Sequence, residues 1–501
     1  MLVWPALVLL VGLQLAGGLI SFAGDALVLV LYLVLSAVAW ELGYVSADGI
    51  TYGEQMREDA LEVLAWTLLV GACASAVVAF VQVLDVWEGV SWISRMPELR
   101  RPGSNLGQPN QLATLLLMGL ASLLFLQQCG RLAVATAWLL FLLLCGALAA
   151  TESRTGVLSY VLLMLWCLSG RWRSSLRISH LALASGGLLF LGLYLVWPLL
   201  MSSGDYYAQG AQVNTHAGLR LVVWPQLLEA VALRPWAGWG LREVSEAHNA
   251  VVYAHTVSEP FTYAHNIVLE LAVGAGLPVT VLLLILVSVW GWRRLHAARA
   301  LRSWYCVAAV LPVAVHSMLE FPFAYAYFLA PALFLLGALE ALVGTKAAWH
   351  IGIKTAIAIV LLIGIVALWS VVEYSEIEED FRVARFEALR IGQTPPEHKR
   401  PRVILLTQLS ALLDGARIQP CPGMSAEMLA LARKVAMRYP APALQNRYAL
   451  SLALNGQADE ALRQLRVMRA LHGEKTYAEI KLNWNSLAQG KYPQLRELSL
   501  P

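Results

Sequence analysis

The sequence predicts an all-α, polytopic membrane protein with a soluble helical domain at its C-terminal end. Hydrophobic residues make up 58% of the 501 residues and charged residues only 14%, and the mean hydropathy is +0.62. An average soluble domain has about 25% charged residues, so this composition excludes a soluble fold for most of the chain. The net charge is only +3 and the sequence contains no basic run, so no nucleic-acid partner is expected.

Apolar runs before residue 372 predict about eleven membrane spans, because a helix needs about 20 apolar residues to cross the hydrocarbon core of a bilayer. The expected spans are residues 2–20, 26–40, 61–84, 110–126, 132–150, 156–169, 181–201, 267–290, 304–319, 324–343 and 351–371. The first run lacks a positively charged start and a small-residue cleavage site. We therefore expect it to be a retained helix rather than a signal peptide.

Basic residues predict the orientation of these spans. They cluster in the connections after the sixth, eighth and tenth spans, at Arg171, Arg173, Arg177, Arg293, Arg294, Arg299, Arg302, Lys346 and Lys354. These connections are all even-numbered and so share one side, and Lys and Arg favour the cytoplasmic side. The N-terminus is therefore expected in the cytoplasm, and the loop after the seventh span and the C-terminal tail are expected outside it.

Four regions follow from this pattern. Residues 1–201 form the N-terminal transmembrane helices, 202–264 a large exported loop, 265–371 the C-terminal transmembrane helices, and 372–501 an exported α-helical domain. In the last region, residues 441–455 and 458–472 resemble one tetratricopeptide helix–turn–helix with Gly456 at its turn. Two interpretations remain open: a domain that packs on the membrane part, or a repeat that binds a partner.

Two polar segments next to exported helix ends carry candidate binding residues. Between the third and fourth spans, Gln108 and Asn110 are two of four amide side chains within seven residues. A helix N-terminus with such amides suits an anionic or sugar ligand, although Pro109 also fits a simple helix start. After the fifth span, Arg154 lies on the exported side, against the usual bias. It either pairs with Glu152 or clamps a phosphate bidentately.

The large loop contributes the two strongest candidates. Arg220 precedes a helix expected over residues 221–232, and the segment R-P-W-A-G-W-G follows at 234–240. His265 closes the loop where the next span begins, and a titratable side chain there marks a functional site unless it merely packs. The histidines of this region are His216, His248, His255 and His265. Their spacing matches no compact ligand pattern, so no metal is expected. His248 and His255 are seven residues apart, about two helical turns, which could align them on one helix face.

A fourth motif lies at the exported turn between the ninth and tenth spans, H-S-M-L-E-F-P-F-A-Y-A-Y over residues 316–327. His316 and Glu320 are four residues apart, so they are expected to share a helix face and form a hydrogen-bonded pair. Tyr325 follows five residues later. This pair could bind substrate or could only hold a membrane hairpin together.

Together these motifs resemble one family. The order Q-P-N-x-L-A, S-R-T-G, Arg with P-W-x-G-x-G, A-H-N with G-L-P, and H-S-x-L-E-x-P-x-x-Y-x-Y-F is similar to that of bacterial O-linked oligosaccharyltransferases of the PglL type. These enzymes belong to the O-antigen ligase and polymerase superfamily. The resemblance runs from about Leu2 to the end of the chain. One departure is Gly274, where relatives often have an acidic residue.

The resemblance implies a glycosyltransferase of the GT-C kind in the bacterial inner membrane that needs neither metal nor cofactor. The donor would be an undecaprenyl-pyrophosphate-linked glycan and the acceptor a Ser or Thr of an exported protein, such as type IV pilin. His265 would take the acceptor proton or orient the donor, and Arg220 and Arg154 would neutralise the pyrophosphate. The residues expected to bind substrate are Gln108, Asn110, His316, Glu320 and Tyr325.

Two alternatives belong to other functions. The first is a ligase or repeat-unit polymerase of the same superfamily, although lipid-A ligases usually lack the H-S-x-L-E-x-P turn and the long exported tail. The second is a non-enzymatic polysaccharide or lipid transporter. A transporter is expected to show internal repeat symmetry and helices broken near mid-membrane, and the sequence shows neither.

The Lys and Arg bias generates a first testable prediction. A reporter that is active only outside the cytoplasm should work when fused after residue 240 or at the C-terminus. The same reporter should stay inactive after Arg177 or Arg302, because those connections are expected inside. The activity of the reporter in intact cells measures this, and a cytoplasmic C-terminus would contradict the whole arrangement.

Overall fold

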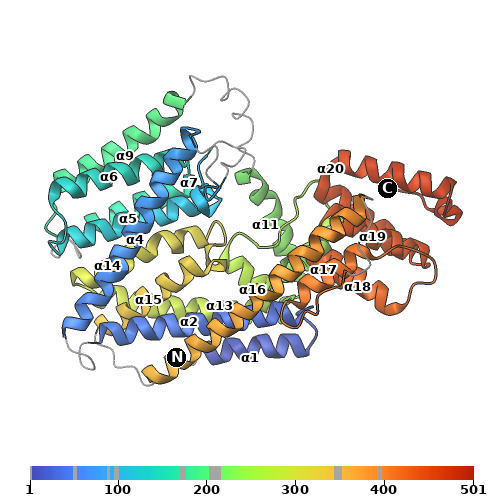
Figure 1. The fold of residues 1–501 in the computed structure, drawn as a ribbon, viewed down its shortest axis with the longest axis horizontal. Helices are drawn as coiled ribbons and strands as arrows, with labels where there is room; N and C mark the ends of the chain where they lie inside the picture. The colour runs from blue at the N-terminus through green and yellow to red at the C-terminus, as the bar shows by residue number, and fades with distance from the viewer. Residues whose placement is uncertain are drawn as a thin grey trace. The chain divides into compact units, whose positions relative to one another are not determined.

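The computed structural model describes residues 3–48, 54–86, 91–94, 101–169, 176–201, 216–343, 352–389 and 398–501, with residues 391 and 394. All regular structure in these residues is helical (Figure 1), which confirms the predicted all-α class. Several expectations fall outside them: the basic residues Arg171, Arg173 and Lys346, residues 202–215 of the large loop, and the side chain of His216.

Each of the eleven expected spans coincides with an apolar helix. These helices are α1 (Val3–Ala16), α2 (Ala23–Ala47), α4 (Glu54–Val83), α5 (Pro109–Gln128), α6 (Val134–Ala150), α7 (Arg154–Leu168), α9 (His180–Met201), α13 (Ile267–Ala297), α14 (Leu301–Ser317), α15 (Ala326–Leu342) and α16 (Ile353–Leu389). Six of them, α2, α4, α5, α9, α13 and α16, are long and apolar enough to cross a membrane. The chain is therefore a multi-pass membrane protein.

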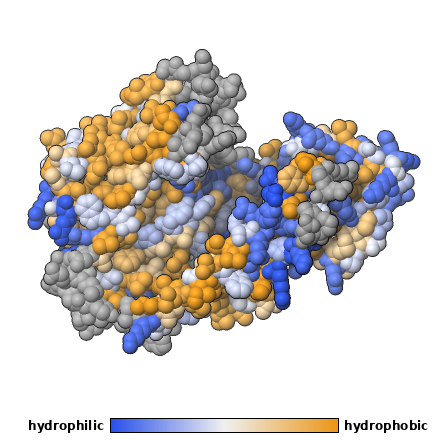
Figure 2. All heavy atoms as spheres, viewed as in Figure 1, coloured by the Kyte–Doolittle hydropathy of each residue, from blue (hydrophilic) through white to orange (hydrophobic). Residues whose placement is uncertain are grey.

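The remaining described helices are polar or amphipathic. They are α11 (His216–Leu233), α12 (Val244–Val252), α17 (Thr407–Arg417), α18 (Ala426–Arg438), α19 (Pro442–Leu454) and α20 (Ala458–Gln489), with short 3₁₀ turns η1 (Ser104–Leu106), η2 (Pro322–Ala324) and η3 (Pro493–Glu497). Hydrophobic residues dominate the surface around α6 and α9, whereas hydrophilic residues gather over the C-terminal helices (Figure 2). This contrast is what membrane-spanning and water-exposed helices require.

The contacts divide the chain into two compact units. Unit one comprises Met1–Val34, His216–Leu284 and Ala358–Pro501, and unit two comprises Leu35–Thr215 and Ile285–Ile357. Helices α2, α13 and α16 begin in one unit and end in the other.

Unit two is built around α5, which packs against α4, α6, α7 and α14. Because lipid tails are as apolar as leucine, helices in a membrane associate through close packing rather than through the hydrophobic effect. Gly119 of α5 shows this, since an added Cβ would collide with the Cβ of Ala72 on α4. Deeper in the unit, the fully buried Tyr305 stacks on Phe125 with ring centroids 4.3 Å apart. Its hydroxyl lies 3.0 Å from Ser122 Oγ, so its polar atom is satisfied inside the bundle.

Unit one joins the C-terminal helices to the beginning of α2. The Arg438 guanidinium of α18 donates to both carboxylate oxygens of Asp25, at 2.8 and 2.9 Å, and both side chains are buried. A second contact joins Arg433 of α18 to Glu246 of α12 at 2.7 Å. Helices α19 and α20 form the expected helix–turn–helix, with Gly456 in the left-handed region at its turn (φ 81°). The C-terminal domain therefore packs on the large loop and on α2.

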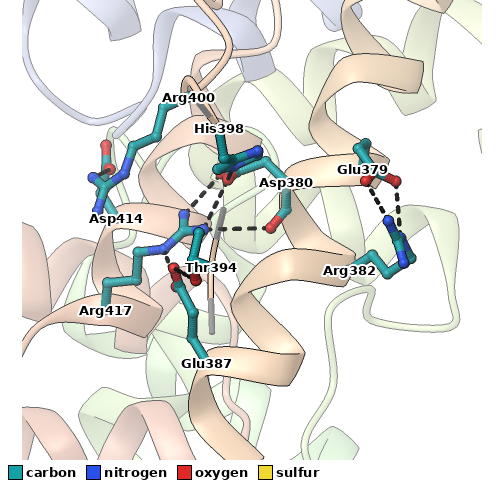
Figure 3. Close-up of polar contacts among 9 residues, drawn as sticks. All are labelled: Glu379, Asp380, Arg382, Glu387, Thr394, His398, Arg400, Asp414 and Arg417. Atoms are coloured by element: carbon teal, nitrogen blue, oxygen red, sulfur yellow. Dashed lines mark hydrogen bonds and ion pairs between the residues drawn. The ribbon is translucent and has the colours of Figure 1, made fainter. Parts of the chain in front are cut away.

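Helix α16 carries the chain from an apolar span into this domain as one helix of 37 residues. Arg417 of α17 binds Asp380 of α16 through two hydrogen bonds of 2.7 Å and also donates to Glu387 at 2.9 Å. His398 lies 2.9 Å from the same Asp380 carboxylate (Figure 3). These ion pairs fix the polar end of α16 against the domain that follows it.

Candidate functional site

In unit one, His265 occupies the turn between the large loop and α13. It adopts a left-handed backbone conformation (φ 55°), which costs a non-glycine residue about 1–3 kcal/mol and is concentrated at functional sites. Its imidazole is half-buried and lies against Phe261, with ring centroids 4.6 Å apart. The turn therefore presents the imidazole in one defined place.

Three side chains hold this turn. Trp224 Nε1 of α11 donates to the carbonyl of Ala264 at 2.9 Å, and Glu270 Oε2 of α13 accepts from the Ala264 N–H at 2.6 Å. Asn266 then caps α13, because its Oδ1 accepts from the backbone N–H groups of the second and third residues that follow it. The Asn of the A-H-N motif is thus a helix cap, and it supports the His beside it.

Arg220 belongs to α11, which begins at His216, five residues earlier than the sequence predicts. It is half-buried and lies one turn before Trp224, on the same face of the helix. Because Trp224 is hydrogen-bonded to the residue that precedes His265, the face of α11 that carries Arg220 is directed toward the His265 turn. The structure thus brings together the neighbourhoods of the two residues predicted to be catalytic.

The glycines of the P-W-A-G-W-G and G-L-P motifs allow two backbones to meet. Trp239 N donates to Val273 O at 2.8 Å, and Leu277 N donates to Pro235 O at 2.8 Å. Gly276 breaks α13 with φ 80° and ψ 168°, a conformation that is essentially restricted to glycine. A Cβ on Gly276 would lie 2.7 Å from the carbonyl carbon of Trp236.

The same contact explains Gly274, the position where this chain departs from its relatives. A Cβ there would lie 3.2 Å from Leu241 Cα, so an acidic side chain would need the neighbouring loop to move. Gln14 of α1 completes the packing: its Nε2 donates to Gly274 O at 2.8 Å, and its Oε1 accepts from Leu241 N at 2.9 Å. Position 274 therefore serves backbone packing in this chain.

The sequence analysis did not select Arg242, a half-buried cation in the same loop. Arg242 has a left-handed backbone (φ 74°) and donates to the hydroxyl of Tyr263, two residues before His265. Its Nε lies 3.8 Å from Asp25, the carboxylate that also binds Arg438. Burial raises the pKa of Tyr263 while Arg242 lowers it, so the phenol stays protonated at neutral pH. Under the predicted topology this arginine lies in an exported loop and breaks the positive-inside bias, which is the signal that singled out Arg154.

Two other loop histidines, His248 and His255, have structural partners. His248 is buried, and its Nε2 lies 2.8 Å from Gln226 Oε1 and 3.0 Å from Ser258 Oγ. Burial lowers the pKa of His248 to about 4, so this imidazole is neutral at pH 7. Helix α12 ends at Val252, so the suggested alignment of His248 with His255 on one helix is wrong. Within the described residues, no three His, Cys, Asp or Glu side chains cluster as metal ligands.

In unit two, Asn110 links three of the predicted motifs. Its Oδ1 accepts from Ser153 Oγ at 2.6 Å, and its Nδ2 donates to Glu320 Oε1 at 3.3 Å. Ser153 also caps α7 by accepting from Gly156 N at 2.9 Å. The Q-P-N, S-R-T-G and H-S-x-L-E motifs therefore meet through side-chain hydrogen bonds.

His316 and Glu320 differ from their expected arrangement. Helix α14 ends at Ser317, so the pair does not continue one helix face, and the bond observed between them is from Glu320 N to His316 O at 2.7 Å. Each side chain reaches α5: His316 Nδ1 lies 2.8 Å from Thr114 Oγ1, and Glu320 meets Asn110. Both are buried, so they fix the turn against α5.

Gln108 and Tyr325 are both half-buried near this network. Gln108 is the N-cap residue of α5, with an extended backbone and no side-chain cap bond, and Pro109 takes the first helical position. Tyr325 stacks between Phe321 and Tyr327, with ring centroids 6.0 and 5.4 Å away. Tyr327, which the sequence analysis did not select, donates from its hydroxyl to Gln111 at 2.6 Å.

Arg154 begins α7 and is exposed, and it forms no ion pair with another residue in the part of the chain that the structure describes. A second arginine lies near it, Arg101, whose Nε donates to Thr151 O at 2.7 Å. Burial lowers the pKa of Arg101. The negative charge of Glu152 raises this pKa, whereas the positive charge of Arg154 lowers it further. Two guanidinium groups next to the positive end of α7 form an electropositive surface that an anion would stabilise.

These observations define a multi-pass α-helical membrane protein whose polar motif residues gather at helix ends rather than along the spans. Comparison with known proteins identifies its relatives. The family described as O-Antigen ligase matches residues 139–284, and the one described as Virulence factor membrane-bound polymerase, C-terminal, matches residues 304–486. The family described as Protein glycosylation ligase matches residues 102–126.

Two curated proteins of Acinetobacter baylyi are similar to this chain. The General O-oligosaccharyltransferase is 25% identical over 468 residues, which cover 91% of this chain and 80% of the relative. The ComP-specific O-oligosaccharyltransferase is 26% identical over 337 residues, which cover 66% of this chain and 59% of the relative. The resemblance predicted from the motifs is thus confirmed: the chain is a homologue of O-antigen ligases and protein O-oligosaccharyltransferases, and hence a transferase.

The close approach of Gly276 to the backbone of Trp236 predicts how an added methyl group at position 276 affects stability. Gly276→Ala should destabilise the protein by about 3 kcal/mol or more, because it adds a Cβ in a glycine-only conformation and against a backbone carbonyl. Gly291→Ala, in the same helix, is the matched control, since a Cβ there meets nothing within 4 Å. Thermal unfolding of both variants in detergent measures the difference. Equal stability of the two would show that the loop and α13 do not approach as closely as described.

Proposed function

We propose that this protein transfers a glycan en bloc from undecaprenyl pyrophosphate to Ser or Thr residues of exported proteins such as type IV pilin. The observation that supports this best is the His265 turn, held in a left-handed conformation and bonded to the face of α11 that carries Arg220. The two curated relatives add support, because both are named as O-oligosaccharyltransferases.

The proposed reaction exchanges one bond at the anomeric carbon of the first sugar. The hydroxyl oxygen of the acceptor forms a bond to that carbon, the bond from the carbon to the phosphate oxygen breaks, and undecaprenyl pyrophosphate leaves with the electron pair. The acceptor proton needs a base. A half-buried imidazole such as His265 can take it, which contributes about 10²–10⁴ in rate.

Arg220 is proposed to neutralise the negative charge that develops on the leaving pyrophosphate. A guanidinium binds phosphate oxygens through two parallel hydrogen bonds, and charge stabilisation is usually the largest catalytic contribution. Arg242 is proposed to position the turn rather than to react, because its hydrogen bond goes to Tyr263 and its charge faces Asp25.

In unit two, Arg154 and Arg101 are proposed to bind phosphate, and Gln108 and Tyr325 to bind sugar hydroxyls or the acceptor. The bonds that Asn110 makes to Ser153 and Glu320 suggest that Asn110 orients these groups. His316 and Glu320 are proposed to maintain the turn that carries Tyr325, since both side chains are buried against α5.

The proposed location is the bacterial inner membrane, with the N-terminus in the cytoplasm and the C-terminus and reaction on the periplasmic side. The Lys and Arg bias supports this orientation. So does the composition of α17–α20, whose polar surface requires water (Figure 2).

A second candidate function is transfer of the same kind of donor to a lipid or to a growing polysaccharide. The matches to the families described as O-Antigen ligase and Virulence factor membrane-bound polymerase, C-terminal, favour it. The protein acceptor is preferred because residues 102–126 match the family described as Protein glycosylation ligase, and the Gln108 and Asn110 motif lies inside that match. Intact-mass analysis of exported pilin, with and without this gene, separates the two functions.

The proposed roles predict the behaviour of three variants. His265→Ala and Arg220→Ala should each reduce glycan transfer by about 10²-fold or more without changing the protein level. Arg220→Lys should restore little activity, because an ammonium cannot make the bidentate contact. His255→Ala is the control, since this loop histidine pairs with Glu229 at 3.0 Å and has no proposed role. Transfer of a lipid-linked donor to an acceptor peptide is the measurement, and wild-type activity of His265→Ala would remove that residue from the mechanism.

If arginines neutralise the charge of the pyrophosphate, the reaction should not require a metal ion. Transfer should persist in excess chelator, because the arginines proposed to bind pyrophosphate supply the positive charge that a divalent cation would otherwise provide. The assay uses purified enzyme, lipid-linked donor and acceptor peptide. If activity disappeared and returned with manganese or magnesium, charge neutralisation by arginine would be the wrong mechanism.

A further inference from the structure

Unit two contains a cavity of about 390 Å³ among α5, α6, α7 and α9. This volume lies within the range of about 300–1,000 Å³ that is typical of ligand-binding pockets. Most of its wall is aliphatic or aromatic, and four polar side chains gather at one end: Gln127, Gln128, Arg177 and Ser179.

This cavity is separate from the motif residues of the same unit. Asn110 lies in the first turn of α5, whereas Gln127 and Gln128 end that helix. Twenty helical residues span about 30 Å, so the two places lie at opposite ends of a membrane-length helix. The cavity therefore does not belong to the group of residues proposed to bind the donor.

Arg177 lies at the polar end of the cavity and carries a positive charge. Gln128 Oε1 accepts from the backbone N–H of Arg177, which fixes the segment before α9. The guanidinium of Arg177 is exposed and makes no hydrogen bond or ion pair with another side chain among the described residues. It is thus available to a ligand at the cavity mouth, and under the predicted topology it faces the cytoplasm.

The inner wall of the cavity is apolar and aromatic. Trp138 and Phe141 of α6 meet edge to face with centroids 5.4 Å apart. On the opposite wall, the Tyr160 hydroxyl donates to Gly186 O at 3.2 Å, so its polar atom is already satisfied. The α5 residues that line the cavity extend from Leu120 to Gln128, eight helical steps that correspond to a depth of about 12 Å. A narrow apolar space of this depth with a cation at its mouth matches an acyl chain that carries a phosphate.

We propose that this cavity binds one acyl chain of an anionic phospholipid, with the lipid phosphate at Arg177. Because the chain would leave one apolar environment for another, its burial alone provides little selectivity. The charge at Arg177 must select the ligand, and the cytoplasmic leaflet is rich in anionic lipids. Only 17% of the most apolar stretch of α9 is buried. A bound lipid would therefore also connect α9 to the rest of the bundle. The proposal does not depend on glycan transfer.

Two variants test the two parts of this site in the full-length protein. Ala182→Trp fills the cavity from α9, and Ala184→Trp is its control, because residue 184 lies on the same helix but is exposed and does not line the cavity. Arg177→Gln removes the cation, and Arg293→Gln removes an exposed arginine elsewhere in unit two. Native mass spectrometry of protein extracted from membranes identifies and counts the retained lipid.

The wild type and both controls should retain one phosphatidylglycerol-type lipid. Its occupancy should fall at least tenfold in Ala182→Trp, since the cavity is then overfilled, and about fivefold in Arg177→Gln. If Ala182→Trp does not fold, Ala137→Leu fills the same cavity from α6 with a smaller side chain.

Phosphatidylglycerol titrated into delipidated protein provides a second readout. It should raise the unfolding temperature of the wild type and the controls but not of Ala182→Trp. Three results would overturn the proposal: equal lipid occupancy in Ala182→Trp and Ala184→Trp, retention of a zwitterionic phospholipid instead, or retention of a polyprenyl phosphate.

Discussion

The approach of the loop over residues 234–240 to the kinked helix α13 is the constraint on which unit one depends. A Cβ at Gly238, Gly274 or Gly276 would meet the backbone of the opposite segment, so these glycines let backbone N–H groups of each segment reach carbonyls of the other. The kink sets where the first turns of α13 lie, and those turns begin directly after His265. Glu270, in the first turn of α13, accepts a hydrogen bond from the backbone N–H of Ala264. The position of the imidazole is thus determined by packing about ten residues away.

A second constraint is electrostatic. Under the predicted topology, Arg154, Arg242 and Arg438 lie on the exported side, against the usual bias of Lys and Arg. Asp25 neutralises Arg438 and lies near Arg242, which locks the C-terminal domain to α2. Arg101 lies near Arg154 instead: burial lowers the pKa of Arg101, the charge of Arg154 lowers it further, and Glu152 raises it. An anion bound beside these two guanidinium groups would favour their charged forms.

The sequence predicted the all-α class and the positions of most helices, because membrane helices are specified largely by length and composition. All eleven expected spans coincide with helices, although only six of these helices are long and apolar enough to cross a membrane. The helix–turn–helix around Gly456 was also found. The site was predicted only in part. Arg242 and Arg101 broke the positive-inside bias as Arg154 did, yet no motif drew attention to them. The hydrophobic periodicity of the sequence does not show that α14 ends at Ser317. The four-residue spacing of His316 and Glu320 fits a helix, but it fits the turn after α14 equally well.

The hydrogen bonds around Asn110 tie three separate motifs to one another. Asn110 accepts from Ser153 and donates to Glu320, so its amide uses both its acceptor and its donor in one orientation. Replacing Ser153 or Glu320 would leave one side of this half-buried amide without its partner, which costs about 1–3 kcal/mol. It would also free the amide to rotate. Arg154 follows Ser153 directly in the chain, so its placement depends on this hydrogen-bond network.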